Sequence, residues 1–390
     1  MRKGWEYKKL GEVCKVINGY AFKSSKYTNK GTRIIRITNV QKGYVVDNDP
    51  KFYSDEDFKD LYQYSLFEGD LVMSLTGNVG RVGILQKDML PAALNQRVAC
   101  LRVKSEKMRL NYLFHLLNSN LFEIAAIQSA RGIAQLNMST EWLKNYIIPL
   151  PPPSTQLAIV SELDKINELI RLKKEQLKDF DNLAQSLFHE MFGDPVENEK
   201  GWEVKKLGEV CCIGTGSTPN RKNKEFYENG TYPWVKSTEV CNLPIYSVEE
   251  YITEEALKNS NCTLYPKNTI LMAMYGQGKT RGQIGLLKIE ACTNQAVAAI
   301  IPTKEVLDEI FLCQHLMLMY EHIRNMARGG NQANLNLSIV KSIQIFLPPL
   351  SLQRLFAQRI EQIEREKSEV QKSIQDLETL LASRMQYWFE

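Results

Sequence analysis

The sequence predicts an α/β protein in which two similar α/β domains are joined by two long antiparallel helices that form a coiled coil. Three observations support this fold class. Residues 4–13 and 201–210 differ at a single position. The pair Pro151-Pro152 recurs at the same offset as Pro348-Pro349, and a heptad pattern of apolar residues follows each pair. Because solenoid units span only about 20–50 residues, this long repeat indicates a duplicated domain and hence a pseudo-two-fold internal repeat.

The chain of 390 residues is long enough for two or three domains. The proline pairs divide it, because proline cannot continue a helix or a central strand. Ser154 or Thr155 in the first repeat, and Ser351 in the second, are predicted to cap the helices that follow. The predicted segments are a first domain (1–150), a helix with its return loop (151–200), a second domain (201–347) and a second helix (348–390).

Each predicted domain contains short apolar runs rich in β-branched residues, which are typical of strands. A helical stretch with a His-Leu pair follows the last run of each domain and is predicted to pack on the sheet. The predicted strands are 33–38, 70–75 and 98–103 in the first domain and 232–236, 269–274 and 296–301 in the second, and the helices are 111–118 and 310–320.

The two long helices carry apolar residues at alternating spacings of four and three, starting at Ile159 and Phe356. Lys173, Lys367 and Arg384 are the exceptions along this seam. An exposed apolar seam needs a partner, and a two-fold relation between the repeats would make the helices antiparallel. We therefore expect the helices to pair with each other, and pairing with another chain is the alternative.

A sequence that resembles a nucleotide-binding loop occurs at 273–280, AMYGQGKT, but alanine replaces the first glycine of the P-loop pattern. The following residues, RGQIGLL, are typical of a strand, whereas a P-loop leads into a helix. The first repeat has SLTGNVGRVGIL at the corresponding place. A hairpin of two strands around a glycine-containing loop is therefore predicted in both repeats.

Motifs for catalysis or metal binding are not found in the sequence. The eight cysteines show no C-x-x-C spacing, and the four histidines follow no ligand pattern. N-P-P-[YF] and D-P-P-Y loops, which are typical of DNA methyltransferases, do not occur. The sequence thus predicts no catalytic residue, no metal and no cofactor in this chain. The N-terminus lacks the apolar stretch of a signal peptide and no apolar run is long enough to span a membrane, so a cytoplasmic location is predicted.

The net charge of +4 is unevenly distributed, because the predicted domains hold the excess of Lys and Arg and the helices hold an excess of Asp and Glu. This charge distribution is expected if the domains bind a polyanion and the helices bind other proteins. Lys and Arg bind phosphates, whereas Arg, Asn, Gln, Ser and Thr also read base edges. The DNA-binding candidates are Lys23, Lys26, Arg33, Arg36, Arg81 and Arg131 in the first domain and Thr218, Arg221, Lys222, Lys236, Lys279, Arg281 and Arg328 in the second.

The chain resembles the specificity subunits of type I restriction–modification systems. The resemblance rests on GWE-x-KKLGEV at the start of each repeat, on residues 214–237 (GTGSTPNRKNKEFYENGTYPWVKS), on LPPPSTQ and LPPLSLQ, and on FGDP at 192–195. It implies that each α/β domain is a target recognition domain that reads one half of a split, asymmetric site on double-stranded DNA. The first domain has NGYAF at 18–22 in place of the G-x-T-P pattern, so its contact residues are less well defined.

The same resemblance implies that the helices dock two methyltransferase subunits, which bind S-adenosylmethionine, and leaves open that translocating restriction subunits join the assembly. On this reading the chain itself is not an enzyme. Two alternatives from other classes are a self-contained DNA-modifying enzyme with an unrecognised site and a coiled-coil structural adaptor without a DNA role.

Overall fold

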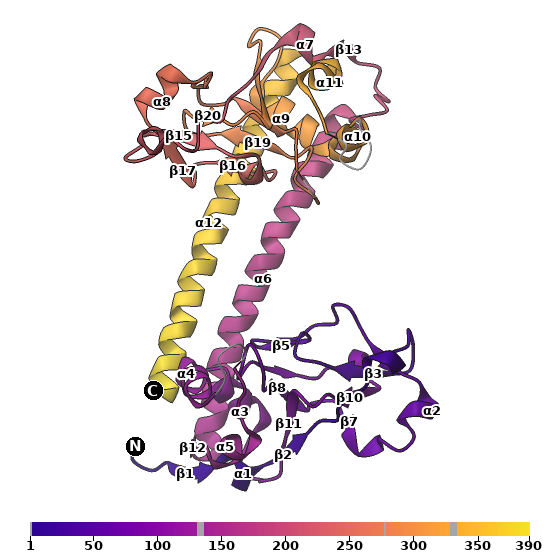
Figure 1. The fold of residues 1–390 in the computed structure, drawn as a ribbon, viewed down its shortest axis with the longest axis vertical. Helices are drawn as coiled ribbons and strands as arrows, with labels where there is room; N and C mark the ends of the chain where they lie inside the picture. Colours follow the sequence, from indigo (N-terminus) through magenta and orange to yellow (C-terminus); the bar gives the residue numbers. More distant parts are fainter. Residues whose placement is uncertain (1, 131–135, 277, 328–333) are drawn as a thin grey trace. The chain divides into compact units, whose positions relative to one another are not determined.

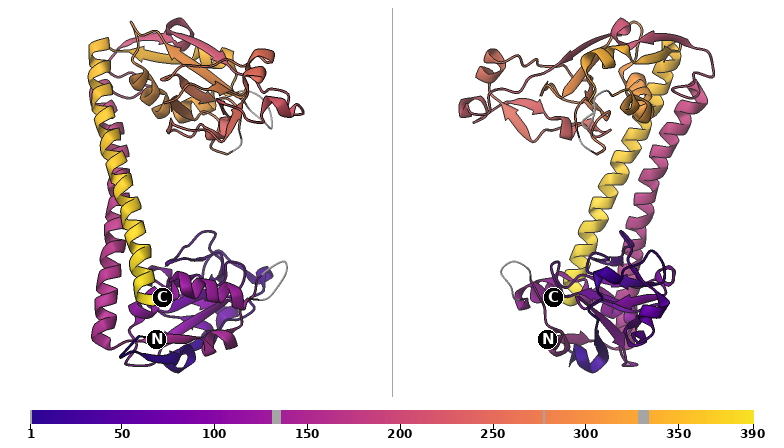
Figure 2. Two further views of the ribbon diagram at one scale, coloured as in Figure 1. Left: turned by 90° about the vertical axis from the view of Figure 1, so that its left-hand side faces the viewer. Right: turned by 45° about the vertical axis from the view of Figure 1, so that its right-hand side comes forward.

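The computed structural model describes residues 2–130, 136–276, 278–327 and 334–390. The chain forms two compact units, of which unit 1 comprises Met1–Lys174 and Lys372–Glu390 and unit 2 comprises Glu175–Gln371. Each unit contains one α/β domain together with a segment of each long helix (Figures 1 and 2). The helices are α6 (Pro153–Phe192) and α12 (Leu350–Phe389).

Unit 1 contains two four-stranded sheets, with strand orders β2-β11-β8-β9 and β6-β3-β10-β7, and the strand pairs β1-β12 and β4-β5. Its strands are β1 (Glu6–Lys9), β2 (Cys14–Asn18), β3 (Thr32–Ile35), β4 (Val40–Gln41), β5 (Tyr44–Val45), β6 (Phe52–Tyr53), β7 (Ser65–Leu66), β8 (Leu71–Ser74), β9 (Val82–Ile84), β10 (Ala92–Leu94), β11 (Val98–Val103) and β12 (Ile147–Leu150). Its shorter helices are α1 (Leu10–Val13), η1 (Ser24–Lys26), α2 (Asp55–Phe58), η2 (Tyr62–Tyr64), η3 (Lys87–Met89), α3 (Leu110–Leu117), α4 (Asn120–Ser129) and α5 (Thr140–Asn145).

Unit 2 repeats this plan with a five-stranded sheet, β14-β21-β18-β19-β16, a three-stranded sheet, β17-β15-β20, and the pair β13-β22. Its strands are β13 (Glu203–Lys206), β14 (Cys211–Thr215), β15 (Tyr232–Val235), β16 (Pro244–Ile245), β17 (Glu250–Ile252), β18 (Ile270–Ala273), β19 (Ile284–Leu287), β20 (Cys292–Thr293), β21 (Val297–Pro302) and β22 (Gln344–Leu347). Its shorter helices are α7 (Leu207–Val210), η4 (Lys224–Phe226), η5 (Ser237–Glu239), α8 (Glu254–Asn259), α9 (Glu309–Leu318), α10 (Tyr320–Asn325) and α11 (Leu337–Ser342).

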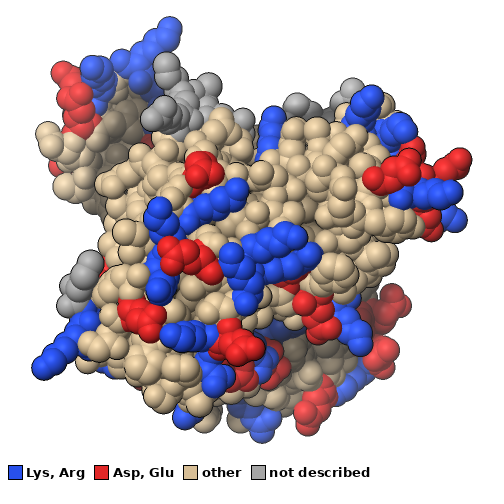
Figure 3. Space-filling view, turned by 90° about the horizontal axis from the view of Figure 1, so that it is seen from below, with Lys and Arg blue, Asp and Glu red and all other residues tan. Residues whose placement is uncertain are grey.

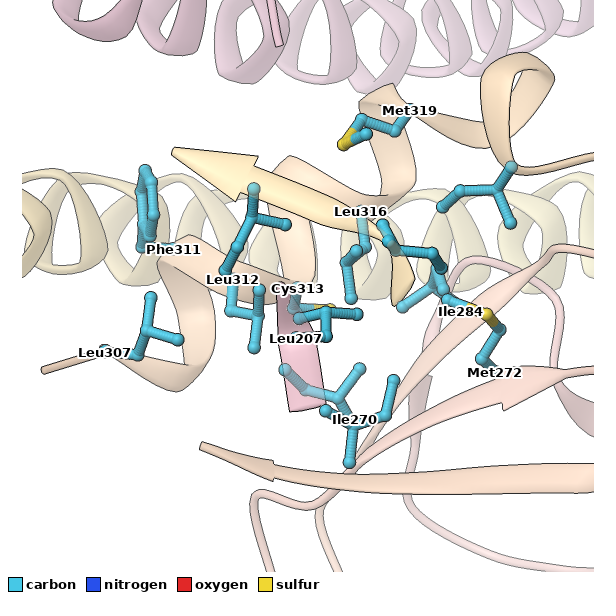
Figure 4. Packing of buried hydrophobic residues seen from close by; sticks show 14 of the residues in the cluster. Leu207, Ile270, Met272, Ile284, Leu307, Phe311, Leu312, Cys313, Leu316 and Met319 are labelled. Carbon is cyan, nitrogen blue, oxygen red and sulfur yellow. The ribbon is translucent and has the colours of Figure 1, made fainter. Parts of the chain in front are cut away.

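The first sheet of each unit is buried on both faces, as the alternation of side chains along its strands shows. In unit 1, Leu71 and Met73 face a core shared with α3, α4 and α6, whereas Val72 faces the second sheet. In unit 2, Ile270 and Met272 face α9 and the long helices, as Figure 4 illustrates for part of that core. Each unit thus has three layers, helices, sheet and second sheet, and the predicted α/β fold class is confirmed.

The predicted strands and helices are found in both units, with ends shifted by a few residues. The predicted strand 33–38 is wrong at its end, because β3 stops at Ile35 and a turn held by the Asn39 side chain follows. The glycine loops join antiparallel strands, β8 to β9 and β18 to β19, as predicted. The sequence that resembles a P-loop is therefore part of a hairpin.

The matching ends of the two repeats close each domain. Strand β1 pairs antiparallel with β12, which directly precedes α6, and β13 pairs in the same way with β22 before α12. Gln156 and Gln353, both fully buried, follow these strands. The Gln353 amide donates to the carbonyls of Val306 and Pro348 and accepts from the Asp308 N–H, and Gln156 makes the equivalent three bonds in unit 1.

The predicted serine and threonine caps are wrong, because both helices begin earlier. The backbone N–H of Gln156 donates to the carbonyl of Pro152, and that of Gln353 donates to the carbonyl of Pro349. Proline is favourable in the first turn of a helix, where its missing N–H would have no partner. Helix α6 therefore starts within its proline cluster, at Pro153, and α12 starts directly after Pro349.

The two long helices pair with each other inside each unit, and the pairing is antiparallel. In unit 1, Lys174 Nζ lies 2.8 Å from Glu378, and Glu162 contacts Arg384 further along. In unit 2, Lys367 Nζ lies 2.9 Å from Asp181. The charged exceptions Lys367 and Arg384 are therefore partnered within the seam, and the apolar seam residues pack into the domain cores.

Candidate nucleic-acid interface

Three of the basic candidates of unit 1 are bound to carboxylates. Lys26 contacts Asp57, and this hydrogen bond raises the pKa of the ammonium group. Arg33 lies 3.1 Å from Asp47, and Arg36 lies 3.4 Å from Asp49. The two arginine side chains are largely buried, and Arg33 also stacks over the Phe52 ring. These arginines hold the irregular segment after β3 and have few donors left for a ligand.

In unit 2 the predicted candidates around β17 form an ion cluster. Glu250 accepts from Arg221 at 2.5 Å and from Lys236 at 3.1 Å, and Lys236 also reaches Glu249 at 2.7 Å. The hydrogen bonds to Arg221 and Lys236 lower the pKa of Glu250. Arg221 additionally lies over the rings of Tyr227 and Trp234. The cluster therefore fixes the loop between β14 and β15.

Three other candidates, Lys23, Lys222 and Lys279, are exposed and form no ion pair within the described residues. Their ammonium groups are available to a polyanion. The Arg281 Nε is buried. The candidates Arg131 and Arg328 lie outside the described residues.

The segment after β2 or β14, the turn after β10 or β20 and the glycine loop of the hairpin lie together at one edge of each domain, which we call the recognition edge. Gly19 and Gly216 occupy equivalent places directly after β2 and β14, and their backbones closely approach the end of β10 and of β20. A Cβ on Gly19 would lie 2.2 Å from the carbonyl oxygen of Asn95, and one on Gly216 would lie 1.8 Å from that of Thr293. A side chain larger than hydrogen does not fit there, so both glycines are explained by packing.

The Asn-Gln turns that follow β10 and β20 lie beside these glycines. The Asn95 and Asn294 side chains accept from backbone N–H groups two residues later, at 3.2 and 3.1 Å, and thereby shape the turns. Gln96 and Gln295 are exposed. The hydroxyl of the predicted candidate Thr218 donates to Oε1 of Gln295 at 2.5 Å. This polar pair is of the kind that reads base edges.

Unit 1 has a hollow of about 340 Å³ next to the glycine loop between β8 and β9. Hydroxyl and amide side chains dominate its lining, which consists of Ile37, Thr38, Gln41, Thr76, Gly77 and Asn78. Thr76 donates to Asn137 at 2.7 Å, and the candidate Arg81 donates to Gln41 at 2.7 Å. Sequence reasoning missed Thr38, Gln41 and Asn78. The available signal was a set of small polar residues around a glycine loop, but only the fold brings residues 37–41 to that loop.

The charge on the surface is mixed. On the face shown in Figure 3, Lys and Arg side chains lie next to Asp and Glu. Among the described residues, no cluster of three or more His, Cys, Asp or Glu side chains has the arrangement of a metal site. No helix among the described residues is long and apolar enough to span a membrane.

The sequence matches a known protein family. The sequence model described as "Type I restriction modification DNA specificity domain" matches residues 2–179 and again 199–379. The specificity subunit of the EcoAI type I restriction enzyme of Escherichia coli is 33% identical over 42% of the chain, a match that spans 28% of that protein. A putative type I restriction enzyme specificity subunit of Methanocaldococcus jannaschii, MjaX, is 23% identical over 97% of the chain and 92% of its own length.

A solved structure has the same fold. The crystal structure of the type I restriction–modification S subunit from M. genitalium aligns with a TM-score of 0.57 and 15% identity, covering 98% of this chain and 95% of that one. Two copies of the same domain model, at the positions of the two repeats, account for most of the sequence. The chain therefore belongs to the family of type I restriction–modification DNA specificity proteins.

Proposed function

We propose that this chain is the DNA-specificity subunit of a type I restriction–modification complex. In this proposal each α/β domain reads one half of a bipartite, asymmetric site on double-stranded DNA. The chain itself performs no catalytic step. With DNA as its partner, it would act in the cytoplasm.

The observation that carries the proposal is the contrast between the matching ends and the differing interiors of the repeats. The β1-β12 and β13-β22 pairs and the buried Gln156 and Gln353 are alike in the two units. The recognition edges differ, because unit 1 adds β7 and the β4-β5 hairpin, whereas unit 2 adds β16 to its first sheet. A common framework with two different polar edges suits the reading of two different half-sites.

The exposed lysines supply the sequence-independent part of binding. Lys23, Lys222 and Lys279 form no ion pair within the described part of the chain, so each can bind a phosphate and release a counterion. The paired candidates Arg33, Arg36, Lys236 and Arg221 hold the loops that carry the recognition residues, and Lys26 does the same for η1. Of the remaining candidates, Arg81, Thr218 and Arg281 would lie at the recognition edges, whereas Arg131 and Arg328 lie outside the described residues and stay candidates from the sequence.

The long helices are proposed to dock two methyltransferase subunits, which would carry S-adenosylmethionine. Leucines remain exposed on both helices although the seam is filled, namely Leu157, Leu169, Leu172 and Leu183 on α6 and Leu355 and Leu380 on α12. Exposed apolar side chains of this kind favour protein contacts. Translocating restriction subunits are further candidate partners of the same assembly.

The test is sequencing that detects methylated adenine in a host that carries the methyltransferase subunit with or without this chain. The expected result is modification of a split sequence only when the chain is present. Purified chain incubated with DNA and S-adenosylmethionine alone should give no turnover, and any turnover would favour a self-contained enzyme. Absence of DNA affinity at every salt concentration, with and without the methyltransferase subunit, would favour a structural adaptor.

A further inference from the structure

Arg81 of unit 1 and Gln283 of unit 2 occupy equivalent positions at the recognition edges. Both end the glycine loop of the hairpin and directly precede its second strand. The carbonyl of Arg81 accepts from the N–H of Ser74 at 3.0 Å, and the carbonyl of Gln283 accepts from the N–H of Ala273 at 2.9 Å. The flanking sequences, RVGIL and QIGLL, match as well. The two repeats therefore present different side chains from the same backbone position.

The Arg81 guanidinium is held by a neutral partner. Its Nη1 donates to Oε1 of Gln41 at 2.7 Å, and Nε2 of Gln41 donates in turn to the carbonyl of Thr38 at 3.0 Å. Arg33 and Arg36, in contrast, are bound to carboxylates. Among the described residues no carboxylate lies within ion-pair distance of Arg81. The orientation of Arg81 is thus restricted by a neutral amide, and its other N–H donors remain for a ligand.

Packing against β9 fixes the residue that holds Arg81. Gln41 belongs to the β4-β5 hairpin, whose Gly43 N–H donates to the carbonyl of Val82 at 2.9 Å. A Cβ on Gly83 would lie 2.6 Å from the carbonyl carbon and oxygen of Tyr44, so the hairpin lies directly on the second strand. Gln41 also lines the hollow of about 340 Å³. The Arg81 guanidinium is therefore bound to a residue that lines an open hollow.

In unit 2 the contact to the second strand of the glycine-loop hairpin is made by a side chain. Asn242 accepts from the N–H of Ile284 at 2.7 Å, where unit 1 has the β4-β5 hairpin. Gln283 is partly exposed, and its amide has both a donor and an acceptor to offer. Arginine fits the two acceptors that guanine presents in the major groove, whereas glutamine fits the acceptor and donor of adenine.

We propose that this position determines specificity in both units, with Arg81 reading a guanine in one half-site and Gln283 reading an adenine at the corresponding place in the other. Gln41 acts as a positioning residue for Arg81. The inference rests on the proposed function and adds to it the bases that one pair of residues selects.

The experiment uses the full chain in complex with the methyltransferase subunit, and all modified sites are determined by sequencing. Arg81→Gln should replace guanine by adenine at one position of one half-site, and Gln283→Arg should replace adenine by guanine in the other. Arg81→Ala should accept several bases at that position, with affinity for the parent site lower by roughly ten- to a hundred-fold. Arg109→Gln, at an exposed arginine of unit 1 outside the candidate set, is the matched control and should leave every recognised base unchanged.

Arg81→Lys separates base reading from phosphate binding, because lysine keeps the charge and loses the planar fork of donors. It should relax the guanine position while the other positions stay the same. The inference is overturned if Arg81→Lys, Arg81→Gln and Arg81→Ala all retain the parent sequence, or if they weaken binding equally for all sequences. A wild-type complex that modifies no split sequence would instead disprove the proposed function.

Discussion

Replacing Gln353 by alanine should destabilise unit 2 strongly, although Gln353 touches no proposed DNA contact. The side chain is fully buried where α12 leaves the domain. Its carbonyl oxygen accepts from the Asp308 N–H at 3.0 Å, and its Nε2 donates to Val306 at 3.1 Å and to Pro348 at 2.8 Å. It thus joins the segment before α9, the end of β22 and the first turn of the long helix.

The size of the effect follows from these three bonds. Each hydrogen bond contributes about 1 kcal/mol net, and each buried backbone group left without a partner adds a desolvation cost. We expect Gln353→Ala to lower the free energy of unfolding of unit 2 by about 3–5 kcal/mol. Gln156→Ala should act similarly on unit 1, because it makes the same three bonds.

Urea denaturation followed by tryptophan fluorescence measures the loss, and hydrogen exchange assigns it to a unit. Exchange at the Asp308 amide should accelerate first in Gln353→Ala. Gln358→Ala, an exposed position on the same helix, is the control and should change stability by less than about 0.5 kcal/mol. If Gln353→Ala cost no more than this control, the buried bonds would not hold the helix to the domain.

Three further predictions concern the seam, the core and the recognition edge. Lys367→Glu should destabilise unit 2 by about 1–2 kcal/mol, because it places like charges beside Asp181 and Glu364, yet leave the recognised bases unchanged. Lys178→Glu, at an exposed position of α6 in unit 2, is the control in both the unfolding and the sequencing measurements. Burial lowers the pKa of His315 to about 4, below its ordinary value of 6.5. Neutral His315 therefore contributes fully to the free energy of unfolding above pH 6.5, and this free energy falls by up to about 3 kcal/mol as the pH drops towards 4. Denaturation at several pH values should show this dependence of unfolding free energy on pH, and His315→Asn should weaken it. If the dependence is the same in His315→Asn, another group causes it. Gly216→Ala should cost about 2–4 kcal/mol, since its Cβ would meet the Thr293 carbonyl, whereas Gly201→Ala, with open space, should cost about 1 kcal/mol in thermal unfolding. If both variants lose the same amount of stability, the contact of Gly216 with the Thr293 carbonyl is not the reason for glycine at this position.

The arrangement of the sheets was harder to anticipate than their strands. Strand β10 pairs parallel with β3 and antiparallel with β7, although each is only a few residues long. Runs this short have no periodicity that specifies a neighbour, so pairing is decided by the packing of the second sheet on the first. The serine caps failed for a related reason, because the buried glutamines and the prolines before them set where each long helix begins.

The sequence by itself determined the duplication, the two long helices and the glycine-loop hairpins, since each is encoded in a local pattern or in a repeat that needs no knowledge of the fold. Only the tertiary structure decided which basic residues are available. Arg33 and Arg221 find carboxylates well separated from them along the chain, at Asp47 and Glu250, whereas Arg81 finds the amide of Gln41. Such pairings depend on distances of a few ångströms between loops, and those distances are set by how the sheets and the hairpin pack.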